Sequence, residues 1–123
     1  MTTRGIRGAI TLITDEKTEL LSATEELLTR IFAENPDLQT EDIASALFTV
    51  TDDITAAFPA QAARNLGWTL VPMLCAREIP VPGSLPLCIR ILIHWNTTIQ
   101  QSEIHHVYLR DSIKLRPDLT PHS

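Results

Sequence analysis

The fold is decided by residues 85–95, which read LPLCIRILIHW. This run is rich in apolar and β-branched residues, which predicts a strand inside a sheet. Side chains alternate across a strand, so one face carries Cys88, Arg90, Leu92 and His94. A guanidinium cannot lose its proton to escape burial, so Arg90 needs an anionic or carbonyl partner, supplied by the protein or by a ligand. The opposite face is predicted to be continuously apolar, with Leu85, Leu87, Ile89, Ile91, Ile93 and Trp95.

Turn residues and hydrophobic periodicity predict the remaining elements. A long amphipathic helix, capped by Thr14 or Asp15, is expected to run until Asn35. A helical turn is expected at 40–42, and a short helix at 59–66 is expected to stop at Gly67. The tail, residues 116–123, is predicted to be mobile. Further strands are expected at 4–12, 46–51, 69–75 (weakened by Pro72, and so an edge or bulge) and 103–109, the last extended by 113–115.

These elements predict a mixed α/β (α+β) fold, with a single sheet of about five strands and one long helix on one face. The length of 123 residues fits one domain, expected to span 1–123. The other sheet face carries apolar positions and arginines and would be bare in a monomer. A closed cyclic oligomer would cover it without leaving open edges.

Composition excludes several classes of function. The net charge of −5 argues against nucleic acid as a partner, because phosphate binding needs a basic field. No apolar run approaches the ~18 residues of a membrane span, and the start of the chain has no apolar leader. Cys75 and Cys88 are therefore expected to be free thiols in a reducing cytoplasm. The spacing of Cys and His predicts no metal site.

Four arginines, Arg7, Arg64, Arg90 and Arg116, lie where they could converge, and eight of the ten cationic residues are Arg. With Cys75, Glu78 and Tyr108 they suit a small polycarboxylate that also carries a hydroxyl. Each has a simpler interpretation. Arg64 and Arg116 could be solvated, Tyr108 and Cys75 could belong to the core, and Glu78 could form an ion pair with Arg77 or Arg90. No nucleophilic triad, GxGxxG motif or P-loop is present in the sequence.

Six short motifs, taken together and in order, resemble the AroH-class (Bacillus-type) monofunctional chorismate mutases. The resemblance covers about residues 4 to 119. Each motif is weak alone, but six in sequence with compatible spacing are highly specific. They are RGIRGA at 4–9, FPA at 58–60 with Arg64, PMLCARE at 72–78, CIR at 88–90, HVYL at 106–109 and LRPDL at 115–119.

The resemblance implies a homotrimeric pseudo-α/β-barrel with active sites between subunits. It also implies the [3,3] rearrangement of chorismate to prephenate, an entry step to phenylalanine and tyrosine, with no cofactor. In the family's pattern Arg90 contacts the ether oxygen and a carboxylate, while Arg7 and Tyr108 hold the side-chain carboxylate. Cys75 and Glu78 meet the ring hydroxyl. Phe58 and the backbone near Met73 and Leu74 line the pocket, Leu115 lies near it, and Arg64 and Arg116 lie at its rim.

The chain departs from the family pattern at two positions. Gln61 stands where the family usually has Lys, which removes one rim charge, and Leu74 stands where Thr is often found. Neither change touches Arg90, so activity is expected, with weaker substrate capture. One alternative is a trimeric small-molecule binding or imine-hydrolysing protein of the RidA type, which the set Cys75, Glu78, Arg90 and Tyr108 disfavours. A second alternative is a homologue that binds without catalysing.

Overall fold

The structure, a computed structural model, describes residues 1–115. The predicted tail 116–123 and the predicted rim residue Arg116 lie outside the described residues. The strands are β1 (Thr2–Thr11), β2 (Ile43–Val50), β3 (Met73–Arg77), β4 (Cys88–Thr97) and β5 (Val107–Tyr108). The helices are α1 (Lys17–Glu34) and α2 (Ala60–Asn65), with 3-10 turns η1 (Thr40–Asp42), η2 (Gln101–Glu103) and η3 (Arg110–Leu115).

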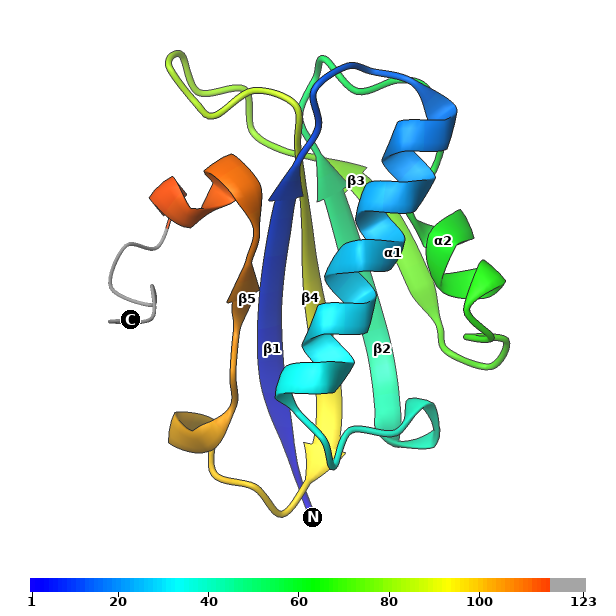
Figure 1. The fold of residues 1–123 in the computed structure, drawn as a ribbon. Coiled ribbons are helices and arrows are strands. Elements are labelled where there is room, and N and C mark those ends of the chain that lie inside the picture. The colour runs from blue at the N-terminus through cyan, green and yellow to red at the C-terminus, as the bar shows by residue number, and fades with distance from the viewer. Residues whose placement is uncertain (116–123) are drawn as a thin grey trace.

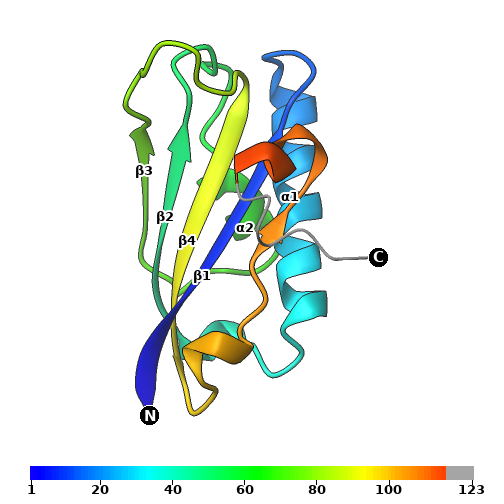
Figure 2. The ribbon, with the colours of Figure 1, turned by 90° about the vertical axis from the view of Figure 1, so that its left-hand side faces the viewer.

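The strands form one five-stranded sheet in the order β3-β2-β4-β1-β5. β4 is antiparallel to both β1 and β2, whereas β3 and β5 are parallel to their neighbours. Both α-helices lie on the same side of the sheet (Figures 1 and 2). In the part of the chain that is described, no α-helix covers the other face. The predicted α+β fold with a single mixed sheet is confirmed.

The core lies between α1 and the sheet. Alternate residues of β4 are buried from Ile89 to Trp95, as predicted. The predicted amphipathic helix buries one stripe of α1, which consists of Leu20, Ala23, Thr24, Leu27, Leu28 and Ile31. Gly8 allows the helix to approach closely, because a Cβ there would lie 2.9 Å from Cδ1 of Ile31. Burying these side chains is the main favourable term in folding.

The start of α1 differs from the prediction. Its N-cap is Glu16, whose side chain makes no capping hydrogen bond. Asp15 instead reaches the loop before α2, where its carboxylate accepts hydrogen bonds from the backbone N–H groups of Thr55 and Ala56 and from the Thr55 hydroxyl. The Thr55 hydroxyl is the main cause that lowers the pKa of Asp15. A tertiary partner thus replaces the local cap.

Two predicted strands begin later than expected. β4 starts at Cys88, because Leu87 has a φ of +50° and its N–H is bound by the Asp53 carboxylate at 3.0 Å. Leu85 and Leu87 therefore lie outside the strand and are only partly buried, although Leu87 still packs against the core. β3 starts at Met73, immediately after Pro72, whose missing N–H cannot join a ladder. The predicted edge position is correct, since β3 is an outer strand.

The predicted strand 103–109 is mostly wrong, since only Val107 and Tyr108 pair with β1. The expected extension at 113–115 is instead part of η3. Side chains take over most of the hydrogen bonding along this edge of β1. Gln101 binds the N–H and carbonyl of Gly5 at 2.9 and 2.7 Å, and Ser112 donates to the carbonyl of Ala9 at 2.9 Å. These bonds satisfy the β1 backbone without a full strand.

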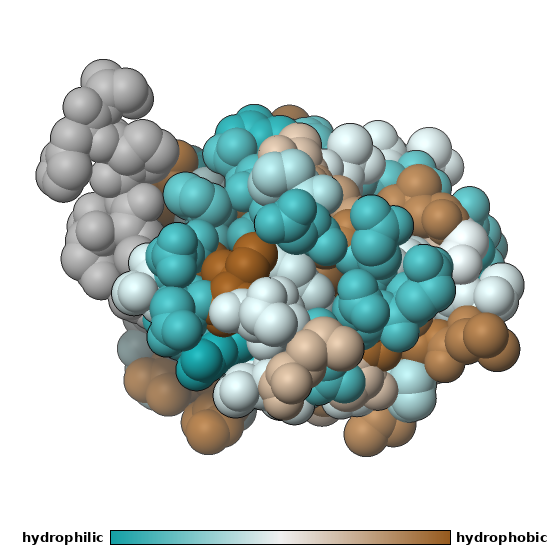
Figure 3. Space-filling view, turned by 90° about the horizontal axis from the view of Figure 1, so that it is seen from below, coloured by the Kyte–Doolittle hydropathy of each residue, from teal (hydrophilic) through white to brown (hydrophobic). Residues whose placement is uncertain are grey.

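The surface at the bottom of the molecule carries both hydrophilic and apolar side chains. Seen from below, hydrophilic side chains predominate and apolar ones form separate areas (Figure 3). Within residues 1–115, no helix is long and apolar enough to cross a membrane.

Candidate active site

Strand register brings the predicted anion-binding residues together. Arg90 on β4 lies opposite Ala9 on β1 and Thr49 on β2, and Ala9 in turn lies opposite Tyr108 on β5. Paired residues share a sheet face, so Tyr108, Arg90 and Thr49 share the face away from α1. Arg7 is two residues before Ala9 and lies on the same face. The small Ala9 leaves room between the larger side chains.

A cavity of about 260 Å³ opens on this face. It collects five predicted site residues, which are Arg7, Glu78, Arg90, Tyr108 and Leu115. Glu78 follows β3 directly and its N–H donates to the carbonyl of Val50 at 2.9 Å. Leu47, Thr49 and Leu92 also line the cavity. Sequence reasoning missed Thr49, and the only signal for it is its register opposite Arg90.

Arg90 keeps one donor unused. Its Nε is buried and has no hydrogen-bond partner among the described residues. The nearest anion is Oε2 of Glu78, at 3.6 Å, which is an ion-pair contact but too long for a hydrogen bond. The predicted alternative of a Glu78–Arg90 ion pair is therefore correct in part, while Arg77 pairs with Asp52 at 3.8 Å. A buried donor left without a partner is costly unless something else binds it.

Glu78 is also held by Thr49, whose hydroxyl donates a hydrogen bond to the same Oε2. The Glu78 side chain is one-quarter exposed and that of Arg90 is 42% exposed, so both can be reached from the cavity. Nearby, Cys88 is buried, and desolvation raises the pKa of its thiol despite the opposing effect of Arg90. Cys88 therefore stays a neutral thiol beside the cation.

Two predicted pocket residues lie elsewhere in the same chain. Phe58 and Cys75 line a second cavity of about 590 Å³, next to α2 and the outer strand β3. Lys17, Gln61 and Arg77 also line this cavity. Cys75 therefore does not meet Glu78 over one substrate position within a single chain.

The remaining predictions fall outside both cavities. Met73, Leu74 and Arg64 line neither of them. Leu74 is 73% exposed on the outer strand. The exposed Arg64 donates to Oε1 of Gln61 at 3.3 Å. Over residues 1–115, no cluster of three or more His, Cys, Asp or Glu side chains could hold a metal ion.

Comparison with known proteins identifies the family. Residues 3–119 match the family described as chorismate mutase type I. The chain belongs to this family. It is 53% identical to the protein named chorismate mutase AroH of Thermus thermophilus over 116 residues, which cover 94% of this chain and 95% of that one. It is 44% identical to the protein of the same name from Bacillus subtilis (strain 168), over 98% of this chain and 94% of that one.

A solved structure shows the same fold. The chorismate mutase from Clostridium thermocellum is similar with a TM-score of 0.85 and 46% identity. The match covers 88% of this chain and 96% of that chain. The membership inferred from the six motifs is confirmed, and these matches do not favour the RidA-type alternative.

Proposed function

We propose that this chorismate mutase family member catalyses the [3,3] rearrangement of chorismate to prephenate. The observation that carries the proposal is the buried Nε of Arg90, a donor without a hydrogen-bond partner among the described residues, on a side chain that lines a cavity together with Arg7, Glu78 and Tyr108. Chorismate is a dianion with a hydroxyl, so two guanidinium groups and a carboxylate match its chemistry. The family match and the names of two relatives point to the same reaction.

The reaction breaks a C–O ether bond while a C–C bond forms in the same molecule, so it needs no nucleophile. The site has two tasks. Arg7 and Tyr108 would hold the side-chain carboxylate and Glu78 the ring hydroxyl, which fixes the folded conformer and lowers the entropic part of the barrier. Arg90 would face the ether oxygen, where negative charge grows as the bond stretches. A fixed cation there stabilises the transition state more than the ground state, which lowers the barrier.

We also propose that the site is shared between the subunits of a homotrimer. One chain alone supplies Arg7, Glu78, Arg90, Tyr108 and Leu115 in one cavity, and Phe58 and Cys75 in another. An adjacent subunit could bring its second cavity onto the first. Phe58 is 71% exposed, and such a large aromatic side chain at a cavity mouth suits a subunit contact. Closing three copies into a pseudo-barrel would also cover the open sheet face.

The remaining parts of the proposal concern organisation and compartment. We propose that residues 1–123 form one domain, with Arg64 and Arg116 as rim residues and Met73 and Leu74 lining the partner's side of the pocket. A reducing cytoplasm suits a protein whose two cysteines are both free thiols.

The test is the loss of chorismate ultraviolet absorbance when purified protein is added. We expect conversion far above the uncatalysed rate. Arg90→Lys keeps the charge but loses the planar fork, and we expect it to cost about 3 kcal/mol of transition-state stabilisation. Arg30→Lys is the matched control, because Arg30 lies on α1 in an exposed ion pair with Glu34. Absence of conversion by the wild type would refute the proposal, and normal turnover of Arg90→Lys would refute the role of Arg90.

A further inference from the structure

Two potential hydrogen-bond donors lie beside Oε2 of Glu78. The Thr49 hydroxyl donates a hydrogen bond to this oxygen, while Nε of Arg90 lies 3.6 Å from it. The Arg90 nitrogen is therefore close enough for ionic attraction but makes no hydrogen bond. Oε2 therefore accepts a hydrogen bond from the neutral Thr49 hydroxyl and none from the charged Arg90 Nε nearby.

The backbone alone does not impose this preference. Thr49 and Arg90 are directly opposite each other on β2 and β4. The Glu78 main chain is tied to Val50, the residue after Thr49, at 2.9 Å. The Glu78 carboxylate consequently lies between the side chains of Thr49 and Arg90. Opposite charges at this separation attract strongly in a partly buried site, so a small side-chain movement would place Oε2 on Nε.

We infer that Thr49 is a positioning residue that holds Glu78 back from Arg90. By binding Oε2, the hydroxyl keeps the carboxylate from closing on Nε, so that this buried donor stays available to the substrate. Without the hydroxyl, Glu78 and Arg90 would form a full ion pair, which would satisfy the donor and reduce the positive charge offered to the ether oxygen. The inference rests on the proposed function, in which Nε of Arg90 is offered to the substrate.

Thr49→Val tests the inference, since valine has the same shape and suits a strand. A hydrogen bond to a charged group is worth enough to change a rate about tenfold, so we expect kcat/KM to fall about tenfold, mainly in kcat. Thr49→Ser restores the hydroxyl and should recover most of the loss. The melting temperature of Thr49→Val should stay close to that of the wild type, which separates positioning from unfolding.

A double-mutant cycle shows whether Thr49 acts through the charge of Glu78. Glu78→Gln removes that charge, so Thr49→Val should cost much less in the Glu78→Gln background than in the wild type. A crystal structure of Thr49→Val should show Glu78 within hydrogen-bonding distance of Nε of Arg90. A carboxylate that stays beyond that distance, or equal costs in both backgrounds, overturns the inference.

The two proposals fail differently. A wild-type protein without activity on chorismate overturns the proposed function, and this inference with it. An active wild type together with an equally active Thr49→Val overturns the inference alone.

Discussion

Arg90 lies in a strand whose alternate residues are buried, yet its own side chain faces a cavity. Its position follows from the alternation of β4, which places residues 89, 91 and 93 against α1 and residue 90 on the other face. The neighbouring buried Cys88 adds no charge, because its raised pKa keeps the thiol protonated. The Arg90 cation is thereby presented to the cavity with the Glu78 carboxylate as its nearest counter-charge.

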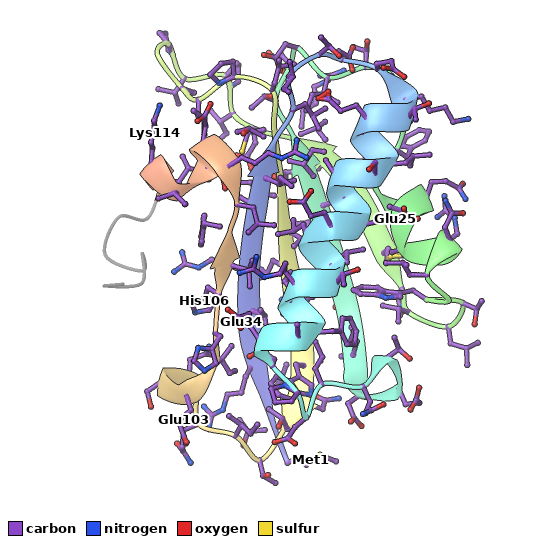
Figure 4. All side chains as sticks on the ribbon, viewed as in Figure 1. Met1, Glu25, Glu34, Glu103, His106 and Lys114 are labelled. Carbon is purple, nitrogen blue, oxygen red and sulfur yellow. The ribbon has the colours of Figure 1, made fainter. Side chains whose placement is uncertain are left out.

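His106 links Arg7 to the segment that carries Tyr108. Its Nδ1 accepts a hydrogen bond from the backbone N–H of Arg7 at 2.9 Å, and the residue lies directly before β5 (Figure 4). Only the neutral ring with an unprotonated Nδ1 can accept this bond. Burial, with a smaller effect of His105, lowers the pKa of His106 below 6.5. The folded protein therefore favours neutral His106 more than the unfolded chain does.

We expect this bond to make stability depend on pH. On acidification the unfolded chain takes up the proton first, so stability is full above the unfolded pKa of about 6.5 and falls as the pH drops below it. Urea unfolding from about pH 7 to about pH 5 should show this loss for the wild type. His106→Asn keeps an acceptor near Nδ1 but does not titrate, so its stability should fall less. Parallel curves for the two proteins would contradict this role.

At the scale of elements, the first turn of α1 carries an unusual charge. Lys17 is the first residue of the helix, where a cation is disfavoured by the helix dipole, at a cost of about 0.3–1 kcal/mol. The structure records no ion pair for it within residues 1–115. Lys17 nevertheless lines the cavity that contains Phe58 and Cys75. Arg77, the other cation there, is engaged by Asp52 and by backbone carbonyls.

We expect Lys17 to assist capture of the dianionic substrate, a role that matters more because Gln61 carries no charge. Lys17→Gln should raise KM several-fold and leave kcat unchanged, since the interaction would be similar in ground and transition states. Its thermal stability should be equal or slightly higher, because the unfavourable helix charge is removed.

Lys114→Gln is the matched control, because this substitution removes the same charge from the protein. The Lys114 side chain points away from the sheet (Figure 4). Steady-state kinetics at several salt concentrations would measure both variants. An equal rise in KM for the two would show a general charge effect and no specific role for Lys17.

At the scale of the whole molecule, the separation of the two cavities predicts complementation between inactive variants. Arg90→Ala removes the cation of the first cavity, and Phe58→Asp places a repelling charge in the second. Each protein alone should have little activity. In trimers refolded from an equal mixture, about a quarter of the shared sites would receive both wild-type halves and recover activity.

Light scattering should accompany that experiment, with an expected mass of three chains. Phe58 is largely exposed in the single chain, so Phe58→Asp leaves the core intact and its folding can be checked by melting temperature. A monomeric mass, or a mixture no more active than its components, would contradict a site shared between subunits.

Local sequence patterns determined much of the fold of this protein. Apolar residues repeat with period two in 85–95 and with helical period in α1, so the sheet, the covering helix and the face of Arg90 follow from residues close in sequence. The six motifs likewise predicted the family, which the comparisons confirm. Predictions failed where a distant partner replaced a local rule, as when Asp15 bound Thr55 and Ala56 and did not cap its own helix.

Tertiary structure decided the rest, because register and hydrogen bonding between distant segments leave no periodic trace in a sequence. Side chains from 101–112 bind the edge of β1, which is why β5 is only two residues long. The contact of Thr49 with Glu78 beside Arg90 depends on three segments meeting in one register. The division of the predicted pocket into two cavities also appeared only in the folded chain. Cys75 pairs with the buried Phe48 on the helix-covered face of the sheet, whereas Arg90 pairs with Thr49 on the other face.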